Sequence, residues 1–204
     1  MDSSVRRPSL ALLGLVAFGL AACGGGAGDE AEIKAVVEVS ATSRNPADCR
    51  RYGTMNMLER SFKAQGQAAV RACEESKLEA RDLPTAVEVT RIEIDGAAAT
   101  AQVGSVDGPY DEQEVVIGLV EENGSWKEDE ALEFAVFDRE AFLLEFGREV
   151  MKRADTPAQA RASACMVGQL EGLDDAALEA LLLDPSPQPI LDLARPCEPR
   201  STSL

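Results

Sequence analysis

The spacing of apolar side chains changes twice along the chain, and the changes divide it into three parts. Between residues 29 and 79, apolar residues recur every three or four positions, which is typical of helices with one buried face. Between residues 86 and 127 they alternate with polar residues or run together, as they do in strands. From residue 138 onward the helical spacing returns. Helices, then strands, then helices predict an α+β fold.

The first part is expected to form several short helices. Ile33, Val36 and Val37 share one helical face, and charged residues occupy the other. Asn45-Pro46 combines a capping residue with a first-turn proline, so a new helix should start there. The predicted helical segments are 29–41, a short piece opened at residue 45, 54–63 and 66–79.

The middle part predicts four antiparallel strands. Asp95-Gly96 and Asn123-Gly124 are residue pairs typical of tight hairpin turns. The apolar parity of the first strand changes between Val89 and Ile92, which predicts a bulge near Thr90-Arg91. The predicted strands cover 86–94, 97–103, 114–121 and a return strand that starts at Ser125.

The last part predicts a small helical unit. Residues 138–153 carry an apolar stripe that includes Phe142 and Phe146, and Thr156-Pro157-Ala158-Gln159 fits a capping box for the next helix. A third helix begins near Asp174, and its leucines are expected to pack against the phenylalanines. We therefore expect a signal peptide (1–22), a Gly-rich tether (23–30), an α+β domain (31–133) and a helical C-terminal domain with a disordered tail (134–204).

The start of the chain has the pattern of a secretory signal. Arg6 and Arg7 precede an apolar stretch at 10–22, which is shorter than the roughly 20 residues that a membrane-spanning helix needs. Its end, Leu20-Ala21-Ala22-Cys23, resembles the lipobox of bacterial lipoproteins. This resemblance implies that Cys23 receives a diacylglycerol and that the chain is cut before it. The alternative is an ordinary signal peptide that happens to have a cysteine at its cleavage site.

Charge and composition exclude several classes of function. The chain has 20 Lys and Arg against 36 Asp and Glu, a net charge of −16, whereas nucleic-acid binding needs a basic surface. It contains no histidine, which excludes Ser-His-Asp and Cys-His catalysis and His-ligated zinc. We expect no cofactor, no metal and no nucleic-acid partner.

Apart from Cys23, four cysteines remain, which is an even number. In an exported protein such cysteines usually pair, and four of them allow three connectivities. We favour Cys49–Cys73 and Cys165–Cys197, because each pair lies within its own compositional segment. A zinc site made of four thiolates is the rival interpretation, but no Cys-x-x-Cys pair supports it.

The order of elements up to the hairpin at 121–127 resembles the nuclear-transport-factor-2-like superfamily, over about residues 30–132. The resemblance implies N-terminal helices packed on a curved antiparallel sheet, a cone that can enclose a pocket. Some members use pocket carboxylates as bases, but no Asp or Glu here stands at a recognisable motif position. The candidate polar residues for such a pocket are Tyr52, Arg91, Tyr110 and Glu114, and the alternative is that they lie on the surface or rim.

Two further features have plain structural interpretations. The acidic run Glu128-Asp129-Glu130 is interpreted as a solvated strand end. Trp126 follows a hairpin turn and is expected to fill the core, because a lone tryptophan buries a large apolar area.

Together these observations predict a lipid-anchored protein on the extracytoplasmic face of the cell membrane. We expect it to be non-enzymatic and to bind a small apolar ligand or another envelope protein, with the lipid on Cys23 as its link to the membrane. One alternative is an isomerase- or cyclase-type enzyme that uses a buried carboxylate. The other is a structural assembly protein in which the helical appendage fills the cone.

Overall fold

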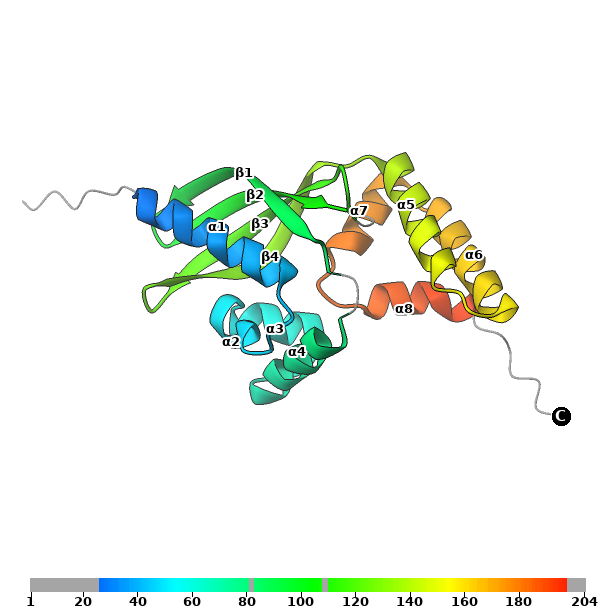
Figure 1. The fold of residues 1–204 in the computed structure, drawn as a ribbon, viewed down its shortest axis with the longest axis horizontal. Coiled ribbons are helices and arrows are strands. Elements are labelled where there is room, and N and C mark those ends of the chain that lie inside the picture. The colour runs from blue at the N-terminus through cyan, green and yellow to red at the C-terminus, as the bar shows by residue number, and fades with distance from the viewer. Residues whose placement is uncertain (1–25, 81–82, 108–109, 198–204) are drawn as a thin grey trace, which may run out of the picture.

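The computed structural model describes residues 26–80, 83–107 and 110–197. The expected signal peptide, Cys23 and residues 198–204 at the end of the expected C-terminal domain lie outside the described residues. N-terminal helices pack on a four-stranded antiparallel sheet, and C-terminal helices follow at one end of it (Figure 1). The α+β class and this order of elements are as expected from the sequence.

Most elements begin and end within a few residues of the predicted positions. Two bounds differ from the expected domain division: the first helix begins at Ala27, inside the expected tether, and the last strand continues to Val136, past the expected boundary at 133. The elements are α1 (Ala27–Thr42), α2 (Asp48–Tyr52), α3 (Met55–Phe62), α4 (Gln67–Glu79), β1 (Ala86–Asp95), β2 (Ala98–Val106), β3 (Glu114–Glu122), β4 (Ser125–Val136), α5 (Arg139–Lys152), α6 (Pro157–Glu171), α7 (Asp175–Leu183), α8 (Gln188–Ala194) and a final 3-10 turn, η1 (Arg195–Cys197).

The sheet has the order β1-β2-β3-β4, so each strand pairs with its neighbour in the chain. The register of β1 against β2 shifts between Val89 and Arg91, which confirms the predicted bulge. Asn123 and Gly124 both have positive φ, of 55° and 75°, as a two-residue hairpin turn requires. The β3–β4 pair has three further register shifts, and one of them leaves Asp129 as an extra residue in β4.

One helix covers one face of the sheet. α1 runs across the strands (Figure 1), and its residues Ile33 and Val37 are fully buried there. The sheet contributes alanines at Ala99 and Ala101, whose small side chains let the helix approach closely. Trp126 is 2 % exposed and belongs to this cluster, which confirms its predicted position in the core.

Each helical region contains a disulfide. Cys49–Cys73 joins α2 to α4 and lies within a small cluster of buried apolar side chains. Cys165–Cys197 joins α6 to η1 at the end of the described chain. The pairing favoured from the sequence is thus confirmed. In the C-terminal helices, Phe142 is the centre of the third cluster, and its ring contacts those of Tyr110 and Phe146 at 5.7 Å.

A buried glutamine connects the sheet to the C-terminal helices. Gln113 is 1 % exposed, and its side-chain amide forms two hydrogen bonds with the backbone of Asp138. Its Oε1 accepts from the Asp138 N–H at 2.7 Å, and its Nε2 donates to the Asp138 carbonyl at 3.2 Å. The Asp138 carboxylate in turn caps α5 by accepting from the Ala141 N–H. This amide therefore fixes the direction in which α5 leaves the sheet.

Replacing Gln113 by leucine is expected to lower the free energy of unfolding by about 1–3 kcal/mol, because the Asp138 N–H and carbonyl lose the hydrogen bonds of the buried Gln113 amide. Urea unfolding of the full chain measures the effect. Gln169→Leu on the exposed side of α6 is the matched control and should change stability by less than about 0.5 kcal/mol. Equal losses in the two variants would contradict this role of Gln113.

Candidate functional site

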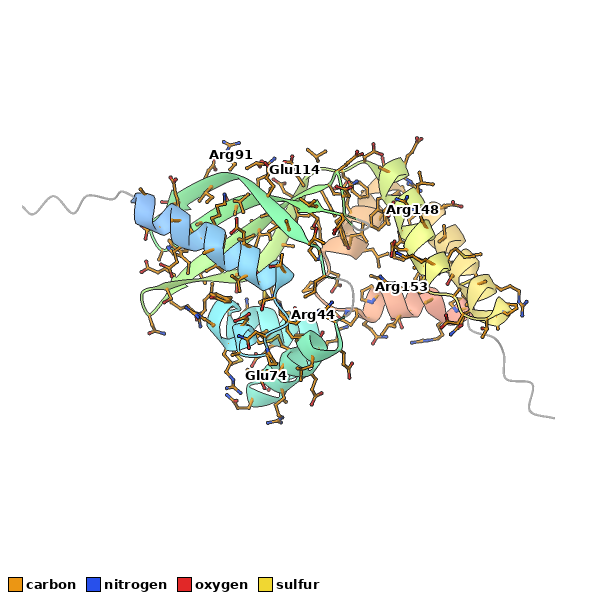
Figure 2. All side chains as sticks on the ribbon, in the orientation of Figure 1. Arg44, Glu74, Arg91, Glu114, Arg148 and Arg153 are labelled. Carbon is orange, nitrogen blue, oxygen red and sulfur yellow. A yellow bond between two sulfur atoms is a disulfide. The ribbon has the colours of Figure 1, made fainter. Side chains whose placement is uncertain are left out.

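The four residues that the sequence suggested for a pocket do not come together. Tyr52 lies at the end of α2 and packs against the core between α1 and the sheet. Tyr110 belongs to the apolar cluster of the C-terminal helices. Arg91 and Glu114 lie on the side of the sheet away from α2, α3 and α4 (Figure 2).

The register of the sheet explains the position of Arg91 and Glu114. Arg91 pairs with Gln102, which alternates with the buried Ala101 and therefore points to the opposite face from α1. The Gln102 amide hydrogen-bonds the Glu114 carboxylate, and Arg91 forms an ion pair with Glu93. These side chains make a polar outer face of the sheet, as in many antiparallel sheets with one covered side.

A different group of polar side chains does come together, where α1, α2 and α4 meet β4. Glu128 Oε2 accepts a hydrogen bond from Ser40 Oγ at 2.7 Å. Lys77 Nζ donates to the carbonyls of Ser40 at 2.5 Å and Ser43 at 3.0 Å, so it satisfies the C-terminal end of α1. Asp48, 6 % exposed, lies close enough to act electrostatically on Lys77. We call Ser40, Asp48, Lys77 and Glu128 the Glu128 cluster.

Burial controls the protonation of this cluster. Desolvation raises the pKa of Glu128 from 4.5 to about 7, although the hydrogen bond from Ser40 and the charge of Lys77 both oppose the rise. Burial also lowers the pKa of Lys77, against the opposing charges of Glu128 and Asp48. Because its pKa is near neutrality, the Glu128 carboxyl can gain or lose a proton at physiological pH, which is the property that a general acid or base needs.

The interpretation of residues 128–130 as a solvated strand end is therefore wrong. Asp129 Oδ1 accepts hydrogen bonds from Thr54 Oγ1 at 2.6 Å and from Asn56 Nδ2 at 3.3 Å. Glu130 forms an ion pair with Arg60 at 2.8 Å. The backbone participates as well, because the Thr54 N–H donates to the Glu128 carbonyl at 2.9 Å. All three acidic residues thus bind the helices to β4.

The sequence carried a signal for the burial of Glu128 that the acidic run concealed. Glu128 is two residues after Trp126, so the two side chains share a face of β4, and Trp126 was expected in the core. The extra residue Asp129 then breaks the alternation, so a regular pattern does not extend to Glu130.

Three surface pockets among the described residues lie elsewhere. One of about 320 Å³ is at the β1–β2 hairpin, and one of about 400 Å³ lies along α4. A third, of about 700 Å³, lies between α5 and α6, and Glu128 lines none of the three. We call this third one the α5–α6 groove; it is lined mainly by apolar or small residues, namely Glu140, Leu143, Leu144, Gly147, Arg148, Met151, Ala164, Val167, Gly168 and Glu171.

Two searches of the described residues give negative results. They contain no group of three or more His, Cys, Asp and Glu side chains placed to hold a metal ion. None of the described helices has both the length and the apolar character needed to span a membrane. In comparisons with known proteins, the chain matches no family model, no curated protein and no solved structure.

Proposed function

We propose that this chain is a lipid-anchored protein of the extracytoplasmic face that acts by binding another protein rather than by catalysis. The two disulfides point to an oxidising, extracytoplasmic environment, where such bonds form and persist. The lipobox-like Leu20-Ala21-Ala22-Cys23 supports export and anchoring through a diacylglycerol. Two acyl chains hold a protein stably at a membrane, whereas one holds it only marginally.

The packing of the sheet favours a protein partner over a small ligand inside the fold. The helix order, the four-stranded sheet and its bulges support a nuclear-transport-factor-2-like cone. Ile33, Val37 and Trp126 fill the space between α1 and the sheet with the chain's own side chains. The apolar α5–α6 groove lies on the C-terminal helices instead. This contrast is the observation that carries the proposal, and it favours the helical appendage as the binding surface.

A carboxylate-dependent enzyme is the second candidate, because Glu128 has a pKa near 7. General acid or base catalysis needs a substrate atom within hydrogen-bonding reach of the carboxyl group. The hydrogen-bond donor to the Glu128 carboxylate is Ser40, a group of the protein itself, and none of the three cavities above reaches Glu128. We therefore rank catalysis below protein binding.

Mass spectrometry of the native protein tests the anchoring. We expect a chain that begins at Cys23, carries a diacylglycerol and contains two intramolecular disulfides. The variant Cys23→Ser is expected to keep residues 1–22 and to lack the acyl mass, because cutting before a lipobox cysteine acts on the lipid-modified residue. If Cys23→Ser is cut like the wild type, the segment is an ordinary signal peptide. An unprocessed cytosolic chain with free thiols would overturn the whole proposal.

A further inference from the structure

Helix α5 has two apolar faces, and the described fold buries only one of them. Phe142 and Phe146 face the core of the C-terminal helices. On the opposite face Leu144 is 76 % exposed and Met151 is 44 % exposed. An amphipathic helix of a globular protein needs one apolar stripe, so the exposed parts of Leu144 and Met151 form a second stripe that the described fold does not cover.

The exposed stripe has the spacing of a helix–helix interface. The groove-lining residues of α5 include Glu140, Leu144, Gly147 and Met151, at intervals of four, three and four residues. This is the spacing at which apolar side chains form the seam between packed helices. Gly147 lies against α6, since a Cβ atom at that position would be 3.7 Å from the Val167 side chain. The two helices therefore present one continuous, shallow surface.

The charge of this surface permits association with a second copy. The whole chain has a net charge of −16, but residues 139–171 contain five acidic and five basic residues, so α5 and α6 with their connection are neutral. Two copies that meet here avoid the repulsion that acidic surfaces elsewhere on the chain would create. Glu140 and Glu171 line the groove at one end, whereas Arg148 lies two helical turns further along α5, where Figure 2 labels it.

We propose that the α5–α6 groove is a homodimer interface in which two copies pack antiparallel about a two-fold axis near Leu144. Leu144 is midway between Glu140 and Arg148 in the sequence, so such an axis brings Glu140 of each copy opposite Arg148 of the other. The helix pairs of the two copies then form a four-helix bundle. Arg148 is 70 % exposed and also contacts Glu145 of its own helix. An exposed ion pair adds little binding energy, so the two Glu140–Arg148 pairs fix the antiparallel orientation of the dimer more than they strengthen it.

The size of the surface indicates a weak dimer that depends on the membrane. Helices of 14 and 15 residues are roughly 20 Å long at 1.5 Å per residue. Side by side they offer roughly 400–600 Å² per copy, less than the roughly 800 Å² per partner of a standard stable interface. Anchoring two copies to one membrane raises their effective concentration and compensates for this. The inference therefore rests on the proposed anchoring function and adds the identity of the partner.

The first test is disulfide crosslinking between two copies at a residue near the proposed two-fold axis. In the acylated full-length protein in its native membrane, Leu144→Cys places a thiol near the axis, and mild oxidation is expected to give a covalent dimer. Leu78→Cys is the matched control, because Leu78 is 69 % exposed on another helix, α4, and should not crosslink. Peptide mapping checks that the two native disulfides persist. An adduct with a different protein, or equal crosslinking of both variants, would overturn the homodimer.

The second test reverses the charges of Glu140 and Arg148, which are opposite one another in the proposed dimer. Glu140→Arg and Arg148→Glu alone are each expected to reduce the Leu144→Cys crosslink severalfold, and the double swap should restore it. Leu144→Glu should weaken self-association of the acylated protein in membranes at least tenfold, measured by energy transfer between labelled copies, with the same thermal unfolding midpoint as Leu78→Glu. A monomeric protein with acylated Cys23 would overturn the dimer and leave the anchoring proposal intact. A dimer crosslinked through Leu144→Cys in a protein whose Cys23 is not acylated would overturn the anchoring and leave the interface.

Discussion

Removing the Cys49–Cys73 disulfide by a double change to alanine is expected to lower the free energy of unfolding by about 3–4 kcal/mol. The bond closes a loop with a sequence separation of 24, and loop-closure entropy of that length gives this magnitude. Cys49 and Cys73 are only 3 % and 7 % exposed and form part of their cluster, so lost packing adds to the effect. Denaturant unfolding measures it.

The second disulfide provides the matched comparison. Cys165–Cys197 closes a loop of similar length, with a separation of 32, but both cysteines are only half-buried. Its removal is expected to cost the same entropic amount without the packing loss, and so to destabilise less than removal of Cys49–Cys73. The informative result is which disulfide costs more free energy of unfolding when it is removed. A larger loss at Cys165–Cys197 would contradict the packing role of Cys49–Cys73 in α2–α4.

Replacing Glu128 by glutamine is expected to change how stability depends on pH. The folded state raises the pKa of this carboxyl from 4.5 to about 7, so folding favours the protonated form. The stabilisation is fully present below pH 4.5 and is lost as pH rises through 7. Glutamine resembles the protonated acid at every pH. Relative to the wild type, the variant should therefore gain about 3 kcal/mol between pH 4.5 and 8.5, by the linkage of about 1.4 kcal/mol per pKa unit.

Unfolding curves across that pH range test the prediction. The groups that act on the Glu128 carboxyl come from two helices: Ser40 on α1 and Lys77 on α4. Asp48 on α2 acts on Lys77. Glu133→Gln, on an exposed position of the same strand, is the control and should shift stability by the same small amount at every pH. A flat difference for Glu128→Gln would contradict the buried carboxyl.

Local rules predicted most of the elements. The Asn123-Gly124 turn adopts the two positive φ angles that only a few residues tolerate, and the change of parity after Val89 marked the bulge. Thr156 accepts from the Gln159 N–H, as its capping box predicted. The disulfide pairing also followed from the sequence, because each bond remains within one helical region.

The positions of polar side chains could not be predicted in the same way, because they depend on packing between elements far apart in the chain. Tyr110 is drawn into the C-terminal cluster by Phe142, which is 32 residues later in the sequence. Arg91 faces outward because the bulge sets its register. The Glu128 carboxyl is desolvated because helices converge on β4, and no local pattern within an acidic run shows that convergence.

The two edge strands, β1 and β4, prevent pairing with strands of other molecules in different ways. On β4, the Glu128 carbonyl is occupied by the Thr54 N–H, and Gly53 forms a bridge with Glu128, so a neighbouring chain finds that stretch already paired. On β1, the bulge and the charges of Glu88 and Arg91 interrupt the flat hydrogen-bonding ribbon that fibril growth requires. At high local concentration, both edge strands therefore disfavour the strand pairing between molecules that starts amyloid-like aggregation.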